Sequence, residues 1–236
     1  MDLTPSTTLA EIASHRPALT RDLERLGLDY CCGGRRSLAE ACLERGLDPD
    51  ATAAELTRAA VAEAAAPDWT ALSPAELVAH LVATHHFFLK QELPRLSELA
   101  AKVSRVHGDR HPELIEVAAL LAQLRAELEP HLQQEEQVLF PLIHSLVTAT
   151  SRPSGHTGSI ADAIARMERE HVAVGALLER LRQHTGGYQA PADTCASTWA
   201  LMAGLADLEA DTHLHVHKEN NQLFPAVLAL EQQWRD

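Results

Sequence analysis

The sequence predicts an all-α protein, and three observations support this prediction. Helix-forming residues (Ala, Leu, Glu, Gln and Arg) dominate the 236 residues, which include only 4 Phe and 2 Tyr. Sequences of the form Ser/Thr-x-x-Glu, which cap the first turn of a helix, precede segments with helical apolar spacing. Four long segments of this kind are separated by stretches rich in Gly, Pro and Ser. We therefore expect an antiparallel four-helix bundle preceded by a small helical domain.

Residues 1–57 are expected to form the small domain. Capping sequences at Thr8–Glu11 and Ser37–Glu40 begin two of its helices. Turns between the short helices are expected at glycines, which adopt backbone conformations that other residues avoid, namely Gly27, Gly33, Gly34 and Gly46. Residues 58–72, which include an Ala-rich stretch, are expected to be a linker.

Residues 73–236 are expected to form the bundle. A third capping sequence, Ser73–Glu76, begins its first helix. The four long helices are expected over residues 74–106, 112–147, 159–184 and 196–220. At a rise of about 1.5 Å per residue, each would be roughly 35–55 Å long. Short connections between helices of this length favour antiparallel neighbours.

Charge and cysteine content restrict the classes of function. The formal net charge of −13 would repel phosphates and anionic lipid headgroups, so neither nucleic acid nor a membrane is an expected partner. No uncharged apolar run reaches the roughly 18 residues of a membrane span. Four cysteines, two of them adjacent, make a poor disulfide framework and suit a reducing compartment. Because the N-terminus also lacks the apolar core of a signal peptide, we expect a cytoplasmic protein.

One sequence pattern occurs twice in the bundle. The pattern H-x-x-x-E-x-x-x-L-F-P begins at His131 and again at His215. Residues four apart lie on one face of a helix, with Cβ atoms about 5–6 Å apart. Each copy therefore presents an imidazole and a carboxylate in the same direction. The two carboxylates are those of Glu135 and Glu219.

Histidines in the preceding helices have matching spacings. His86 lies 45 residues before His131 and 85 residues before His171. His171 lies 44 residues before His215, and His131 lies 84 residues before it. The bundle is thus predicted to contain two copies of a helical hairpin. Together they bring four imidazoles and two carboxylates into its interior, too many for one tetrahedral zinc but suited to two bridged metal ions, and this donor type favours iron. The predicted ligands are His86, His131, Glu135, His171, His215 and Glu219.

The donor pattern resembles that of a haemerythrin-like domain, and the whole chain resembles the repair-of-iron-centres family of ScdA/YtfE-type di-iron proteins. The resemblance extends to the N-terminal run Leu28-Asp-Tyr-Cys-Cys-Gly-Gly, to Arg105-Val-His and to both L-F-P sequences. It implies the same six ligands and two non-haem iron ions, bridged by an oxo or hydroxo group and by carboxylates. It also implies that Glu127 and Glu170 line the approach to the iron pair, where they relay protons or guide iron.

The resemblance implies repair of iron–sulfur clusters damaged by nitric oxide or reactive oxygen, with damaged iron–sulfur proteins as partners. Two mechanisms are compatible with the ligand set. In one, iron is donated, with Cys31 and Cys32 handing over iron or electrons; in the other, the iron pair binds nitric oxide and reduces it to nitrous oxide. The alternative function is that of a haemerythrin-type carrier or sensor of dioxygen or nitric oxide. Oxygen-carrying relatives have a fifth histidine and lack the Cys-Cys-Gly-Gly run, which favours repair. The sequence leaves open whether the protein is an enzyme and whether it forms a homodimer.

Three neighbouring histidines offer alternative ligands. His85 directly precedes His86 and could replace it, although the family's spacing to a later leucine favours His86. His213 and His217 form an i, i+4 pair of their own, but they lie about 160–200° around the helix from His215. The repeated Glu and L-F-P positions favour His215.

The cysteines are expected to differ in role. Cys31 and Cys32 are too close for a comfortable disulfide, because adjacent Cα atoms lie about 3.8 Å apart. The two glycines after them and two nearby arginines, whose charge would favour thiolate, predict reactive thiols. Cys42 and Cys195 are expected to be buried packing residues. His107 is expected either to line the metal site or to cap the first long helix.

Overall fold

The computed structural model describes residues 3–60, 69–149 and 160–233, and these residues are mainly helical. Their extended pairing is limited to an isolated bridge between Thr8 and Ser37. The all-α prediction is confirmed. The chain divides into two compact units, one formed by Val78–Thr212 and the other by Met1–Leu77 together with His213–Asp236. Residues 61–68 of the expected linker lie outside the described residues.

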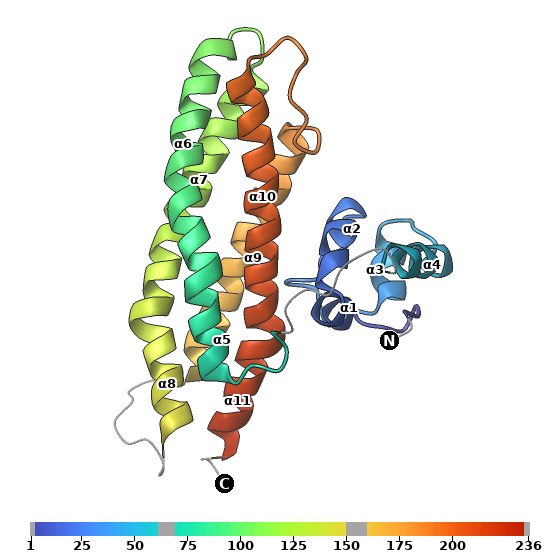
Figure 1. The fold of residues 1–236 in the computed structure, drawn as a ribbon, viewed down its shortest axis with the longest axis vertical. Coiled ribbons are helices and arrows are strands. Elements are labelled where there is room, and N and C mark those ends of the chain that lie inside the picture. Colours follow the sequence, from blue (N-terminus) through green and yellow to red (C-terminus); the bar gives the residue numbers. More distant parts are fainter. Residues whose placement is uncertain (1–2, 61–68, 150–159, 234–236) are drawn as a thin grey trace. The chain divides into compact units, whose positions relative to one another are not determined.

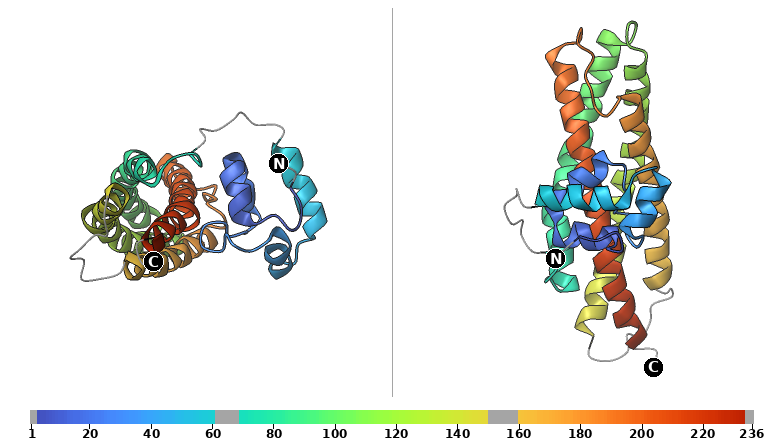
Figure 2. Two further views of the ribbon diagram at one scale, coloured as in Figure 1. Left: turned by 90° about the horizontal axis from the view of Figure 1, so that it is seen from below. Right: turned by 90° about the vertical axis from the view of Figure 1, so that its right-hand side faces the viewer.

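The unit Val78–Thr212 is a four-helix bundle (Figure 1). Its long helices are α6 (Phe87–His107), α7 (Glu113–Gln134), α9 (Ile160–His184) and α10 (Ala196–Lys218), the last belonging to this unit as far as Thr212. Successive helices run in opposite directions, and the end-on view in Figure 2 shows them around a common core. That core is rich in leucine and receives side chains from all four helices, among them Leu93, Leu121, Leu178 and Leu205. The predicted bundle is confirmed.

The residues that the structure describes include three wide π-helical turns that the sequence did not predict, two inside predicted helices and one at the predicted end of the last helix. They cover Val82–His86, Glu135–Leu139 and Glu219–Leu223. Each separates a long helix from a short one, namely α5 (Pro74–Leu81), α8 (Phe140–Thr148) and α11 (Phe224–Gln233). In α8 the second residue is Pro141, which has no N–H for an ordinary helical hydrogen bond to the preceding turn. Wide turns of this kind are frequent at functional sites, and all three here begin or end at a predicted ligand.

All three predicted capping sequences begin helices. The Thr8 N–H donates a hydrogen bond to Glu11 Oε2 (2.8 Å), and the Glu11 N–H donates one to Thr8 Oγ1 (3.2 Å), at the start of α1 (Leu9–His15). Ser37 caps α3 (Leu38–Glu44) and Ser73 caps α5 in the same way. Each cap contributes about 1 kcal/mol to helix stability.

The other unit contains the short N-terminal helices. They are α1, α2 (Thr20–Arg25), α3 and α4 (Pro49–Ala60), with a 3₁₀ turn over Pro17–Leu19. Leu9, Ile12, Leu23 and Leu38 are completely buried in its core, which also includes Val216 from the C-terminal segment. No helix in the described part of the chain is long and apolar enough to cross a membrane.

Candidate metal centre

Glu135 is the centre of the donor cluster in the bundle. Its side chain is completely buried at the end of α7. Its two oxygens face different imidazoles, because Oε2 lies 3.4 Å from His86 Nε2 and Oε1 lies 3.2 Å from His131 Nε2. These two histidines are on separate helical segments. Glu135 and both imidazoles could therefore act together as metal ligands.

His171, in the middle of α9, adds a third imidazole. Its Nε2 lies 3.2 Å from Nε2 of His131, and both side chains are buried. The donor atoms of His131, Glu135 and His171 all lie within 4.8 Å of one another. A cation could accept all three of these ligands at once.

Outer carboxylates orient two of these imidazoles. His86 Nδ1 lies 2.8 Å from Glu136 Oε1, and His131 Nδ1 lies 2.8 Å from Glu170 Oε2. An ionised carboxylate only accepts hydrogen bonds, so each Nδ1 carries the proton and each Nε2 keeps its lone pair for a metal. Burial opposes ionisation of Glu136, but hydrogen bonds from Lys90 and His86 lower the pKa of its carboxyl group.

The second copy of the sequence repeat has the same local geometry. His215, in the last turn of α10, and Glu219, the first residue of the following wide turn, are both buried. His215 Nε2 lies 3.3 Å from Glu219 Oε1, against 3.2 Å for the corresponding atoms of His131 and Glu135. The pattern thus produces the same imidazole–carboxylate pair twice.

The neighbouring histidines have other partners. His85 Nδ1 lies 2.8 Å from Asp211 Oδ1, so it is His86 that faces Glu135. Next to His215, the ring of His213 lies 3.3 Å from Glu24 Oε1.

His217 lies between Ser14 Oγ and the Tyr30 carbonyl, each 3.2 Å from a ring nitrogen. Burial lowers the pKa of His217 to about 4, so this imidazole is neutral at physiological pH. Neither His213 nor His217 is directed at Glu219 as His215 is.

The two acidic residues expected at the approach differ. Glu170 contacts His131 and is partly exposed, so it connects a donor imidazole to solvent. Glu127 is exposed and makes no hydrogen bond or ion pair with any residue that the structure describes. Sequence reasoning missed Glu136, the counterpart of Glu170. The available signal was its position directly after Glu135, as Glu170 directly precedes His171.

Replacing Glu170 by glutamine is expected to weaken iron binding about 10- to 100-fold, the usual effect of losing a carboxylate that orients a ligating histidine. The amide would no longer accept a charge-assisted hydrogen bond from His131 Nδ1. Competition with a ferrous chelator measures the change. Glu127→Gln is the matched control and should bind iron as the natural chain does; equal weakening in both variants would contradict the assignment.

The N-terminal unit holds a second cluster, around Cys31 and Cys32. The backbone N–H groups of both cysteines donate to Asp29 Oδ1, at 3.2 and 2.9 Å. The two Sγ atoms lie 3.8 Å apart, and Cys31 Sγ lies 3.2 Å from the same carboxylate oxygen. Asn221 donates a hydrogen bond to the Cys31 carbonyl, at 3.0 Å. A Cβ on Gly34 would lie only 2.6 Å from a backbone carbonyl oxygen, that of Tyr30, which explains the glycine.

The electrostatic setting of these thiols differs from the expectation. Of the two nearby arginines, Arg36 pairs with Glu44, and the charged group that faces the thiols is Asp29. The neighbouring Cys32, burial and Asp29 raise the pKa of the Cys31 thiol well above its usual value. These surroundings favour the protonated thiol form of Cys31.

The other two cysteines differ in their exposure to solvent. Cys42 is buried, as expected. The expectation for Cys195 is wrong, because this residue is exposed at the start of α10. Its position just before the first helical residue leaves its side chain outside the core, which periodicity alone did not reveal.

The donor set fits iron. A carboxylate as buried as Glu135 is costly unless a cation compensates it, and imidazoles that present Nε2 lone pairs toward it are suited to metal binding. Nitrogen and oxygen donors without thiolate are typical of non-haem iron. These clusters are suited to a pair of iron ions.

Comparison with known proteins identifies both parts of the chain. Residues 77–227 match the family model of the hemerythrin HHE cation binding domain, and residues 5–60 match the ScdA N-terminal domain, a domain of unknown function. The probable iron-sulfur cluster repair protein of Haemophilus influenzae is 36% identical over 222 residues, covering 93% of this chain and 96% of the relative. The iron-sulfur cluster repair proteins YtfE of Enterobacter sp. strain 638 and of Escherichia coli O1:K1 are each 34% identical over 223 residues, covering 94% of this chain and 97% of the relative.

Proposed function

Because the chain belongs to the family of haemerythrin-type di-iron proteins with an ScdA-type N-terminal domain, we propose that it repairs damaged iron–sulfur clusters. The observation that supports this most directly is the buried Glu135 carboxylate between the imidazoles of His86 and His131. It provides a site for a pair of iron ions inside a helical bundle. The names of the relatives supply the process in which such iron is used.

We propose as iron ligands all six residues of the repeated pattern, His86, His131, Glu135, His171, His215 and Glu219. Four of them are in the bundle unit, and the distances of Glu135 to His86 and His131 and of His171 to His131 support this set. His215 and Glu219 are proposed to complete the set because they repeat the spacing, burial and local geometry of His131 and Glu135. When bound, the iron pair supplies redox chemistry and open positions for a small ligand such as nitric oxide or dioxygen.

Of the two repair mechanisms, we propose iron donation. Asp29, Cys31 and Cys32 present one carboxylate and two sulfur donors within 4.8 Å of one another. A partly exposed group of this composition can take up ferrous iron and pass it to a thiolate-rich cluster site, with the Cys31 proton leaving as iron binds. Glu170, at the surface end of the His131 hydrogen bond, is proposed to carry the accompanying proton.

The experiment is a repair assay with an iron–sulfur enzyme inactivated by nitric oxide. The iron-loaded chain should restore its activity and lose iron in proportion. A Cys31→Ser/Cys32→Ser variant should keep its iron but restore activity at least tenfold more slowly. Catalytic consumption of nitric oxide without loss of iron would instead identify the reductase mechanism, and a stable dioxygen adduct without repair would identify a carrier.

We propose a cytoplasmic location for this protein. The four cysteines form no disulfide, which supports a cytoplasmic location. We also propose the organisation expected from the sequence, with a small domain over residues 1–57, a linker over 58–72 and the di-iron bundle over 73–236. The matched domain models, over residues 5–60 and 77–227, support these boundaries.

A further inference from the structure

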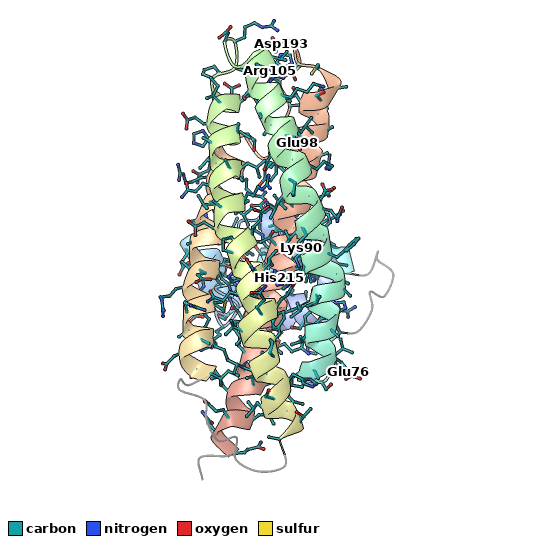
Figure 3. All side chains as sticks on the ribbon, turned by 90° about the vertical axis from the view of Figure 1, so that its left-hand side faces the viewer. Glu76, Lys90, Glu98, Arg105, Asp193 and His215 are labelled. Atoms are coloured by element: carbon teal, nitrogen blue, oxygen red, sulfur yellow. The ribbon has the colours of Figure 1, made fainter. Side chains whose placement is uncertain are left out.

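A cysteine and a histidine meet at one end of the bundle. Cys195, just before the first residue of α10, is exposed, and its Sγ lies 3.3 Å from Nε2 of His107, the last residue of α6. Figure 3 shows Arg105 and Asp193, each two residues from this pair, at the same end of the bundle, and Lys90 well along it. Lys90 is the partner of Glu136 beside the metal centre. The pair is thus separate from the proposed iron site.

The start of α10 favours negative charge on this sulfur. The Cys195 carbonyl accepts the first hydrogen bond of the helix, from the Thr198 N–H at 2.9 Å. Backbone N–H groups of Ser197 and Thr198 also form hydrogen bonds with the Cys195 sulfur, at the positive end of a 23-residue helix. Thiolates are stabilised in this position and by a neighbouring imidazole. Both influences act on the same Sγ atom.

The other charged groups nearby do not oppose a thiolate. Asp193 has partners of its own, with Arg110 Nη1 at 3.6 Å and His111 Nε2 at 2.9 Å. On the other side, Lys102 donates a hydrogen bond to Ser197 Oγ at 3.3 Å. The hydrogen bond with His107, followed by those from the backbone N–H groups of the first helical turn, lowers the pKa of Cys195 to about 6.

The environment of His107 indicates that the pair is more than packing. Its side chain is 6% exposed, and its Nδ1 has no hydrogen-bond partner among the described residues. Among the described residues, the hydrogen bond between Nε2 and Cys195 is therefore the contact that offsets the free-energy cost of burying this ring. A hydrogen bond from an N–H group to a thiolate is stronger than one to a neutral thiol, so it offsets this cost better.

We propose that Cys195 and His107 form a reactive thiolate–imidazole pair that is modified by low-molecular-weight disulfides. Cys195 Sγ attacks one sulfur of the small disulfide and forms a new S–S bond with it, while the original S–S bond breaks. The departing half leaves as a thiolate and takes a proton from water. Cys195 is oxidised to a mixed disulfide and the departing half is reduced, so the exchange needs no other oxidant.

The test uses the full iron-loaded chain and glutathione disulfide, without oxygen, at pH values from 5 to 9. Peptide mass mapping follows mixed-disulfide formation at each cysteine. The rate at Cys195 should rise with a midpoint near pH 6 and then level off, since the thiolate is present above its pKa and is lost as the pH falls below it. Cys32, also exposed but facing Asp29 and Cys31, is the internal control and should react more slowly at pH 6.

His107→Gln keeps a polar side chain but removes the imidazole. It should move the midpoint of the Cys195 rate toward the ordinary thiol value of about 8.5 and lower the rate at pH 6 about tenfold, after allowing for the greater nucleophilicity of a more basic thiolate. His144→Gln, which makes the same change at an exposed histidine of α8 that does not contact Cys195, should leave the midpoint unchanged.

Circular dichroism and iron content check that both variants are folded. If His107→Gln does not fold, the pH profile of the natural chain decides. A rate at Cys195 that keeps rising through pH 8 in the natural chain would overturn the proposal. So would a folded His107→Gln variant with an unchanged profile.

Discussion

Replacing Glu135 by glutamine is expected to reduce bound iron from two ions per chain to fewer than one. The amide has nearly the same size as the carboxylate, so packing is kept, but the negative charge between His86 and His131 is lost. A neutral amide would not offset the positive charge of iron ions bound at so buried a position. Elemental analysis of the purified, iron-treated variant measures the effect.

Glu127→Gln provides the matched control for this experiment. It makes the same chemical change in the same helix, two turns earlier, at a residue that is exposed and has no contact with a donor among the described residues. It should bind two iron ions. If Glu135→Gln also kept two ions per chain, the proposal that this carboxylate is an iron ligand would be disproved.

The second large effect is expected from a pair of adjacent histidines. His86→Gln should lose at least one iron ion, because the Nε2 that faces Glu135 is removed. His85→Gln should keep both ions, since its ring is paired with Asp211 instead. The two variants differ by one position in the sequence and are both buried, so general damage to the bundle would affect them alike.

Iron content and the absorption spectrum of the oxidised protein distinguish these variants. Loss of iron in His85→Gln with retention in His86→Gln would reverse the assignment.

The sequence left this choice open, and the wide turn over Val82–His86 explains why. A turn with one additional residue changes which side of the helix the following residues occupy, and apolar periodicity does not reveal it.

The parts of the site that could be predicted are those with a fixed local spacing. His131 and Glu135 are four residues apart on a helix, so their common direction follows from helix geometry, and His215 and Glu219 repeat it. Likewise, the capping sequences predicted where α1, α3 and α5 begin, because a cap is a contact between residues three apart.

The parts that could not be predicted depend on contacts between distant segments. Glu136 and Glu127 are similar in sequence context, each close to a ligand, yet only Glu136 contacts a donor imidazole, on a helix about fifty residues away. For the same reason the meeting of His107 with Cys195, 88 residues later, was not foreseen. Spacing along one helix specifies direction, but partners across the bundle are set by tertiary packing.

The central claim is that the repeated His and Glu residues hold two iron ions. The most direct test is an oxygen-free titration of the metal-free chain with ferrous iron, followed by the change in absorption or by equilibrium dialysis. We expect saturation at two ions per chain in the natural sequence. Saturation at a single ion, or the absence of a saturable site, would contradict it.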